Sequence, residues 1–275
     1  KARTRYMPAE MGGAEAFIKT YEETLSMVKE VEQLMINPAD YAYEITKRGK
    51  RDDSVVNHRI HRQKQEGLYY VEYHPVGGDA NVEHLLAALD YAITLDQVEA
   101  RLAPEQALYF INLTADEARK IAELTDDSAI NEFRRSVSCV GSTVCQIGIQ
   151  DSNGLLKAIF THLEEKGVDT SKLPRLHISG CPHSCGTHQI GEIGFHGSVK
   201  LVDKKPTTSF MLVDGGSEHM GSENFGKMAG HIVATKIPEF MEALANTLNE
   251  SPEPDFGTWR MTHKAQYMEL IKAFE

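Results

Sequence analysis

Four cysteines are the residues of this sequence best suited to bind a metal. They are Cys139, Cys145, Cys181 and Cys185, the only cysteines among 275 residues, and they form a C-x5-C pair followed by a C-x3-C pair. The stretch that opens the sequence lacks the apolar core of a secretory signal. In a chain without an export signal, clustered cysteines indicate metal ligands before they indicate disulfides.

The spacing of these cysteines leaves three kinds of site to compare. A structural zinc site usually uses two C-x2-C pairs, and neither pair here has that spacing. A disulfide has no support from the expected compartment. An iron–sulfur cluster takes four thiolates at spacings that vary between families. Glycines flank the cysteines and would let backbone N–H groups approach sulfide; they are Gly141, Gly148, Gly180 and Gly186. The pattern favours a cluster, with zinc as the alternative.

The elements around the cysteines alternate between helix and strand. Upstream, strands over 67–73 and 106–112 alternate with helices over 81–94 and 115–125, which predicts a small α+β unit. The polar, cationic stretch 47–65 is interpreted as a linker or a segment that crosses between two structural units. Further helices are predicted where apolar side chains recur every three or four residues and glycine or proline marks an end; these are 14–36, 153–166, 238–249 and 259–274. A β-hairpin is predicted from the β-branched runs 193–202 and 208–213.

Composition narrows the classes of partner. Residues 1–65 carry 12 Lys and Arg against 10 Asp and Glu, whereas residues 66–275 carry 17 against 30. Because nucleic-acid binding needs a cationic surface, this acidic chain is not expected to bind nucleic acid. No run of 18 apolar residues is present, so we expect no membrane span and a cytoplasmic protein.

The cysteine segments resemble the signature of the nitrite and sulfite reductase family. The matching stretches are 138–150 (SCVGSTVCQIGIQ) and 177–197 (HISGCPHSCGTHQIGEIGFHG). Residues 3–6 (RTRY) resemble the linker that follows the first half of the family, and 67–92 resembles the second copy of its ferredoxin-like subdomain. The stretch 212–216 and the helix near 238–249 also fit, so the resemblance covers nearly the whole chain.

This resemblance implies an α+β fold in three parts. Residues 1–65 would form an N-terminal helix and linker, and residues 66–130 a small ferredoxin-like half-domain. Residues 131–275 would form a mixed α/β domain that binds sirohaem and a [4Fe–4S] cluster. The chain would therefore correspond to the C-terminal half of a two-half enzyme.

The resemblance also implies roles for the cysteines. All four would be ligands of the [4Fe–4S] cluster. By its position as the last cysteine of G-C-P-x-x-C, Cys185 would in addition bridge to the sirohaem iron. The reaction implied is the reduction of nitrite to ammonia or of sulfite to sulfide, in which the cofactor performs the chemistry and the protein supplies position and charge.

Three further residues are expected near the cofactor. The family usually has asparagine where this chain has His183, and a histidine there would donate a hydrogen bond or adjust the local charge near neutral pH. A half-exposed loop histidine without a role is the alternative. Thr143 and Gln146 are close enough to the first cysteine pair to line the cofactor.

The expected partners follow from the same resemblance. They are a small anion, either nitrite or sulfite, an electron donor such as ferredoxin, and the N-terminal half of the same enzyme. Because the side chains that hold the anion come mainly from that first half, the isolated chain is expected to catalyse poorly. The alternative function is a non-catalytic iron–sulfur or zinc module that serves as a structural or electron-transfer unit.

Overall fold

The computed structural model describes residues 7–31 and 43–275, which belong to two compact units, 1–46 and 47–275. The first unit contains α1 (Met7–Glu10) and α2 (Ala14–Val31), and no residue of α2 is buried. Helix α2 confirms most of the helix predicted over 14–36. Its expected last turn and the family-like residues 3–6 lie outside the described residues.

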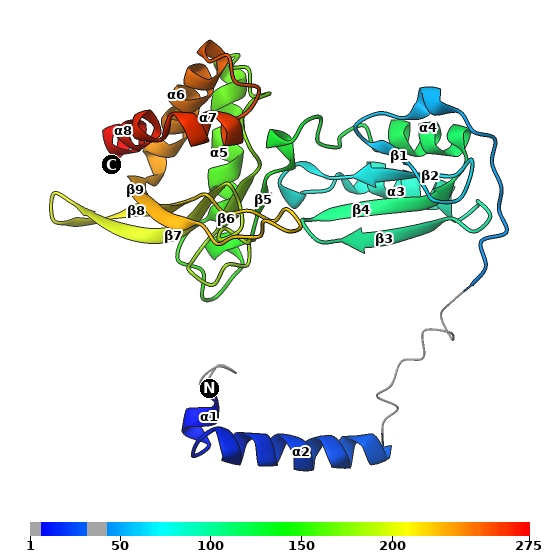
Figure 1. Ribbon diagram of the computed structural model, residues 1–275, viewed down its shortest axis with the longest axis horizontal. Helices are drawn as coiled ribbons and strands as arrows, with labels where there is room; N and C mark the ends of the chain where they lie inside the picture. The colour runs from blue at the N-terminus through cyan, green and yellow to red at the C-terminus, as the bar shows by residue number, and fades with distance from the viewer. Residues whose placement is uncertain (1–6, 32–42) are drawn as a thin grey trace. The chain divides into compact units, whose positions relative to one another are not determined.

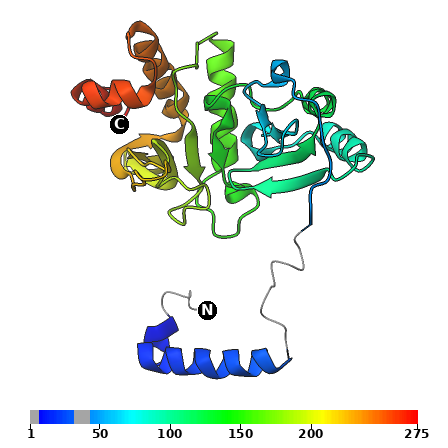
Figure 2. The same cartoon turned by 45° about the vertical axis from the view of Figure 1, so that its right-hand side comes forward.

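A four-stranded antiparallel sheet forms the first half of the second unit, with the strand order β1–β2–β4–β3. Helices α3 (Val82–Ala92) and α4 (Ala115–Leu124) pack on one face of it (Figures 1 and 2). Helix α4 begins with a capping box, in which the Thr114 backbone N–H donates to the Glu117 carboxylate at 2.7 Å. The strands are β1 (Ile60–Arg62), β2 (Tyr69–Tyr73), β3 (Glu99–Ala103) and β4 (Ala107–Leu113).

The stretch 47–65, interpreted from sequence as a linker, belongs to this subdomain instead. Strand β1 pairs with β2, and Val55 and Ile60 are 4% and 2% exposed in the core. The side chain of Lys47 is also largely covered, and its ammonium pairs with Glu117 at 2.7 Å. The predicted boundary between 65 and 66 is therefore wrong, and the compact unit begins at Lys47. The sequence did not predict this, because the stretch is rich in Lys and Arg and only two of its apolar residues, Val55 and Ile60, enter the core.

A five-stranded mixed sheet forms the second half, in the order β5–β6–β7–β8–β9. The first three strands are parallel, and β7 forms the predicted hairpin with β8. Two residues, Asp203 and Lys204, make the turn with φ of +50° and +64°, as a tight hairpin requires. The strands are β5 (Val137–Ser138), β6 (Leu176–Ser179), β7 (Ile193–Val202), β8 (Lys205–Asp214) and β9 (Lys227–Val233).

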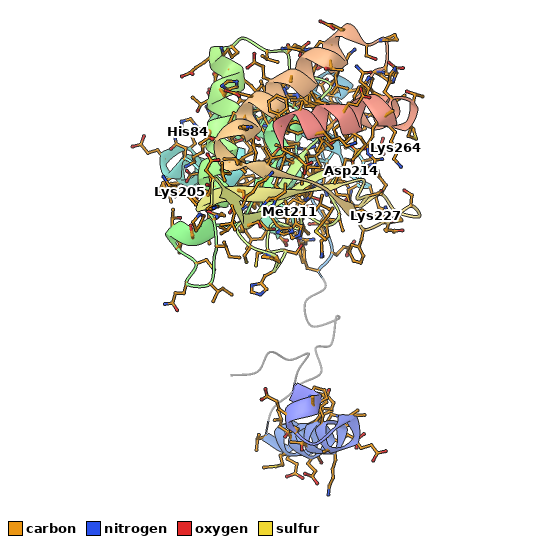
Figure 3. All side chains as sticks on the ribbon, turned by 90° about the vertical axis from the view of Figure 1, so that its left-hand side faces the viewer. His84, Lys205, Met211, Asp214, Lys227 and Lys264 are labelled. Atoms are coloured by element: carbon orange, nitrogen blue, oxygen red, sulfur yellow. The ribbon has the colours of Figure 1, made fainter. Side chains whose placement is uncertain are left out.

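Helices cover one face of this sheet and enclose the larger core (Figure 1). The predicted C-terminal helix is broken at His263 into two. Asp214 at the end of β8 accepts two hydrogen bonds from Arg260, which lies in the first of these helices, and so ties that helix to the sheet. Figure 3 labels Asp214 on the sheet and Lys264 in the second helix. The helices are α5 (Ser152–Glu165), α6 (Ile237–Glu250), α7 (Phe256–Thr262) and α8 (Lys264–Phe274). The expected α+β class is confirmed.

Short 3-10 turns complete the described elements. They are η3 (Asp53–Val55), η4 (Val76–Gly78), η5 (Phe133–Arg135), η6 (Gly141–Thr143) and η7 (Ala234–Lys236). Within the ranges that the structure describes, no helix combines the length and the apolar character needed to cross a membrane.

Candidate metal centre

The first cysteine of each pair lies just after one of two adjacent parallel strands, β5 and β6. Cys139 follows directly after β5, and Cys181 comes two residues after β6. Parallel strands present their carboxyl ends at the same edge of a sheet, so both cysteine loops leave the sheet at one edge. The Cys139 backbone N–H donates to the carbonyl of Ile178 at 3.0 Å, which continues the pairing of the strands up to the first cysteine.

The thiol of Cys139 contacts polar groups from two other segments. Its Sγ accepts from the Gly180 backbone N–H at 3.1 Å and lies 3.1 Å from the Ser152 hydroxyl. The same hydroxyl donates to the Cys139 carbonyl at 2.7 Å. A backbone N–H directed at sulfur stabilises a thiolate, the form that binds metal. The two cysteine loops are therefore joined at a sulfur atom.

The loop from 140 to 150 holds Cys145 by its own backbone. The Cys145 N–H donates to Gly141 at 2.9 Å, and the Cys145 carbonyl accepts from Gly148 at 3.1 Å. The loop then returns to the second one, since the Gln150 N–H donates to the Gly180 carbonyl at 2.8 Å. The first cysteine pair is thereby fixed against the start of the second pair.

The second loop is folded tightly around its last cysteine. Cys181 is 7% exposed, whereas Cys185 is exposed. Ser184 adopts a left-handed backbone with φ of +61°, and the Gly186 N–H donates to the Ser179 hydroxyl at 3.0 Å. A Cβ on Gly186 would lie 2.0 Å from the Ile178 carbonyl oxygen, so only glycine fits there. The turn therefore presents Cys185 outward from the rigid edge of the sheet.

One zinc ion would need the four sulfurs closer together than the structure places any three of them. Four thiolates on one zinc lie about 3.8 Å apart, since each Zn–S bond is about 2.3 Å. Within the described part of the chain, the cysteines do not form a group of three whose sulfurs all lie within 4.8 Å of one another. A cluster of irons and sulfides holds its thiolates further apart than one ion does. Four free thiols, one of which accepts a backbone hydrogen bond from Gly180, fit the ligand set of an iron–sulfur cluster.

The structure places the other predicted residues on the same two loops. The imidazole Nδ1 of His183 lies 3.4 Å from the Cys181 sulfur, on the exposed second loop. Thr143 and Gln146 are exposed on the first loop, and Thr143 donates to the Val140 carbonyl at 3.0 Å. Thr143 also lines a cavity of about 480 Å³. Their contact with a cofactor stays a prediction.

Ser152 and the Gly180 N–H are site residues that sequence reasoning missed. Ser152 is the first residue of α5, and it is fully buried although it is polar. Serine at the start of a helix is ordinarily explained by helix propensity, so its type gave no signal of the thiol contact. A backbone donor such as Gly180 is identified only by the strand pairing that directs it toward Cys139.

Apolar side chains cover the outside of the first cysteine loop. Val140, Val144, Ile147 and Ile149 are 56%, 74%, 61% and 45% exposed. Four adjacent exposed aliphatic residues on one loop are unusual for a free surface, because such patches generally mark a binding face. The loop that carries two of the cysteines therefore also carries a surface suited to an apolar partner.

Two buried histidines lie below the second loop. Burial, assisted by Arg175, lowers the pKa of His177 to about 4, and burial, assisted by His196, lowers the pKa of His188 to about 4. The His188 Nδ1 lies 2.9 Å from the Ser179 hydroxyl, which in turn supports Gly186. The neutral His188 imidazole thus supports the second loop through Ser179.

These histidines predict a dependence of stability on pH. Between pH 6.5 and about 4 the unfolded chain binds protons that the folded chain does not, so the free energy of unfolding should fall as the pH is lowered through this window. Urea unfolding of the purified chain at several pH values measures the slope. A His177→Gln/His188→Gln double variant should make the slope shallower, with the remainder due to the other buried histidines such as His74, whereas His219→Gln, at an exposed site, should leave the slope unchanged. Equal slopes in all three proteins would contradict the assignment.

Comparison with known proteins identifies the family of this site. The family model described as the nitrite and sulphite reductase 4Fe-4S domain matches residues 129–273. The ferredoxin–nitrite reductase of Synechococcus elongatus is 28% identical over 193 residues, which cover 67% of this chain and 37% of that protein. The sulfite reductase [NADPH] hemoprotein beta-component of Bacillus licheniformis is 30% identical over 112 residues, 37% of this chain and 19% of that protein.

Solved structures show the same fold. A Mycobacterium tuberculosis protein, NirA, matches with a TM-score of 0.62 at 20% identity, over 95% of this chain and 48% of that one. A dissimilatory sulfite reductase I matches with a TM-score of 0.53 at 9% identity, over 74% of this chain and 69% of that one. The chain spans between 19% and 37% of the two curated relatives above. Since the family model covers more than half of its residues, the chain belongs to the nitrite and sulphite reductase family, as a member that carries the 4Fe-4S domain.

Proposed function

We propose that this chain is the C-terminal part of a sirohaem–[4Fe–4S] reductase that converts nitrite to ammonia or sulfite to sulfide. The observation that carries the proposal is the junction of the two cysteine loops, where the Gly180 N–H donates to the Cys139 sulfur at the common edge of β5 and β6. The family match over 129–273 includes both loops, and relatives of both reductase types match the chain.

In this proposal all four cysteines hold the cluster, and Cys185 also faces the sirohaem. The bound cofactors would supply stored electrons and the site of anion reduction. Cys181, which is buried, fixes the cluster to the core, whereas the exposed Cys185 is available to a second group. The apolar side chains of the first loop, Val140 and Val144 among them, offer a face for the macrocycle.

The proposal assigns anion binding and electron supply to parts outside this chain. Anions reduced at such a centre need cationic side chains for affinity and for proton supply. We propose that the N-terminal part of the enzyme provides them. Ferredoxin is the proposed electron donor, because the curated plant and cyanobacterial relatives are named ferredoxin–nitrite reductases.

Metal analysis after anaerobic purification tests the cluster. We expect iron and acid-labile sulfide in equal amounts from the cluster, with one further iron for each sirohaem bound, together with the broad visible absorption of thiolate-to-iron charge transfer. One zinc per chain without labile sulfide would contradict the proposal, and would favour the alternative of a zinc-binding module. A chain that holds the cluster but never binds sirohaem would favour an electron-transfer module.

The substrate is decided by a separate experiment on the full-length protein. Turnover is measured with nitrite and with sulfite, each with reduced ferredoxin. The anion with the larger kcat/KM is the substrate. We expect the 275-residue chain alone to turn over neither anion at a comparable rate. Full activity of the isolated chain would contradict the proposed role of the N-terminal part.

A further inference from the structure

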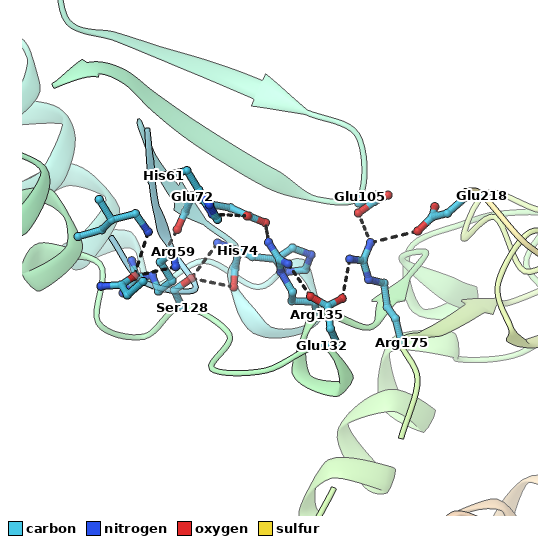
Figure 4. Close-up of polar contacts among 12 residues, drawn as sticks. Arg59, His61, Glu72, His74, Glu105, Ser128, Glu132, Arg135, Arg175 and Glu218 are labelled. Atoms are coloured by element: carbon cyan, nitrogen blue, oxygen red, sulfur yellow. Dashed lines mark hydrogen bonds and ion pairs between the residues drawn. The ribbon is translucent and has the colours of Figure 1, made fainter. Parts of the chain in front are cut away.

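A small polar cavity lies in the four-stranded-sheet subdomain, apart from the cysteine loops. Its volume is about 40 Å³, enough for about three water-sized groups at roughly 10–15 Å³ each. Its lining comes from the residues just before β1, from the end of β2 and from the segment after α4. Figure 4 shows polar side chains of this lining and their contacts. The lining residues that matter here are Arg59, Glu72, His74, Glu132 and Arg135.

His74 contributes an unpartnered imidazole to this cavity. The residue is 2% exposed, and neither ring nitrogen has a hydrogen-bond partner. Its backbone is fully used: the N–H donates to the Ser128 hydroxyl at 3.0 Å and the carbonyl accepts from Ala129 at 2.8 Å. A buried polar group without a partner costs about 1–3 kcal/mol. A ligand that accepts a hydrogen bond would remove this cost, because an imidazole always has at least one N–H to donate.

Arg59 contributes a cation that is paired only with neutral acceptors. Its guanidinium donates to the Glu72 carbonyl at 3.3 Å, to the Ala122 carbonyl at 3.1 Å and to the Thr125 hydroxyl. Among the described residues, no carboxylate lies within ion-pair distance of it. Three of its five N–H groups are thereby used. A half-buried guanidinium without a contacting carboxylate favours a nearby anion.

The carboxylates of the cavity are already occupied by another arginine. Arg135 pairs with Glu72 and, at 2.7 Å, with Glu132. Glu132 also pairs with Arg175 at 3.0 Å, and Figure 4 shows this chain of ion pairs running past His74. The acidic groups therefore have their cations, while donors on Arg59 and His74 remain. A cavity rich in donors selects a ligand rich in acceptors.

We propose that this cavity is an accessory site for a small monovalent anion of halide or nitrite size, held between Arg59 and His74. The anion would supply the acceptor that the His74 ring lacks and the charge that contacts Arg59. A divalent cation is disfavoured, because both carboxylates already bind guanidinium. The site belongs to the fold of this chain and does not depend on the proposed reductase function.

Bromide is the probe that tests the site in the intact chain. Crystals soaked in sodium bromide should show an anomalous peak in the cavity, within hydrogen-bond distance of Arg59 and His74. In solution, bromide should raise the unfolding temperature with a saturating dependence on concentration, as a ligand of the folded state does. A cavity that contains only ordered water, with no anomalous signal, would overturn the proposal.

Two variants locate the effect. Arg59→Gln should weaken bromide binding about tenfold or more, because a charged hydrogen bond is lost. Arg119→Gln is the matched control: it removes the same charge from α4, where the side chain is 46% exposed and pairs with Asp116. The control should bind bromide like the wild type. An equal loss of binding in both variants would show a general charge effect and would also overturn the proposal.

His74→Phe is a second test that leaves the charge unchanged. It fills the cavity and removes both ring nitrogens, so the saturating bromide effect should disappear while the ordinary salt dependence stays. Persistence of the saturating effect in His74→Phe would refute the assignment. Should Arg59→Gln fail to fold, this variant and the wild-type anomalous map still decide between the outcomes.

Discussion

Replacing Cys181 by serine is expected to abolish cluster assembly in this chain. Cys181 is the only one of the four cysteines that is buried, and it lies two residues beyond β6, so of the four proposed ligands its sulfur is tied most directly to the core. A serine oxygen is a hard donor, whereas iron–sulfur clusters are held by soft thiolates. Iron, acid-labile sulfide and visible absorption, measured after anaerobic purification, should fall to background.

The neighbouring His183→Ala variant is the matched control for this loss. His183 lies on the same loop, with its Nδ1 at 3.4 Å from the Cys181 sulfur, but it is exposed and is not proposed as a ligand. This variant should retain the cluster, with at most a shift in its reduction potential, because a hydrogen bond near sulfur tunes potential rather than holding iron. Unchanged iron and sulfide in Cys181→Ser would refute the ligand assignment.

Replacing Gly186 by alanine is expected to destabilise the fold and to displace Cys185. The added Cβ would lie 2.0 Å from the Ile178 carbonyl oxygen and 2.7 Å from its carbon, and backbone of a central strand cannot move aside cheaply. Overpacking of this kind costs about 1–3 kcal/mol. Urea unfolding should report that loss. Iron and sulfide content should fall as well, since Cys185 directly precedes the displaced residue.

Gly257→Ala provides the comparison for this clash. A Cβ on Gly257 would also be crowded, at 2.7 Å, but by the carboxylate oxygen of Glu192, the far end of a flexible side chain. Because Gly257 lies inside α7, alanine should be neutral or slightly stabilising there. If both variants lost the same stability, the rigid contact at Ile178 would not be the cause, and the proposed role of Gly186 would be wrong.

The two sheets contribute differently to the candidate metal centre. The five-stranded sheet carries all four cysteines on loops at one edge, whereas the four-stranded sheet contributes no cysteine. Ion pairs join the two halves: Arg175, just before β6, contacts Glu105 in the turn between β3 and β4. Gln106 of the same turn donates to the carbonyl of Ser138, next to Cys139, at 2.7 Å. The smaller sheet therefore supports the residue before the first cysteine.

Regular, strongly patterned elements are the part of this fold that the sequence predicts well. Helices α3, α4, α5 and α6 lie within a few residues of their expected ranges, because each has apolar side chains at helical spacing between recognisable caps. The hairpin of β7 and β8 has β-branched runs around a polar turn. In these cases the information lies within about fifteen residues of chain.

Short strands are the part that the sequence does not reveal. Strand β5 is two residues long and β6 four, so neither has enough alternation to be recognised. Strand β1 is three residues long within a cationic stretch, and β3 is mostly exposed at an edge. Such strands are stabilised by pairing with distant partners, which local propensity does not encode.

The candidate site shows the same division. The sequence by itself predicted which residues would bind the metal, since four cysteines with flanking glycines in this order are a local pattern. Only the tertiary structure decided that the Gly180 N–H and the Ser152 hydroxyl meet the Cys139 sulfur, and that Arg59 and an unpartnered His74 line one cavity. The physical reason is that a residue's type is read from the sequence directly, whereas its contacts depend on how distant segments pair: Gly180 reaches Cys139 because β5 pairs with β6, with Val137 opposite His177.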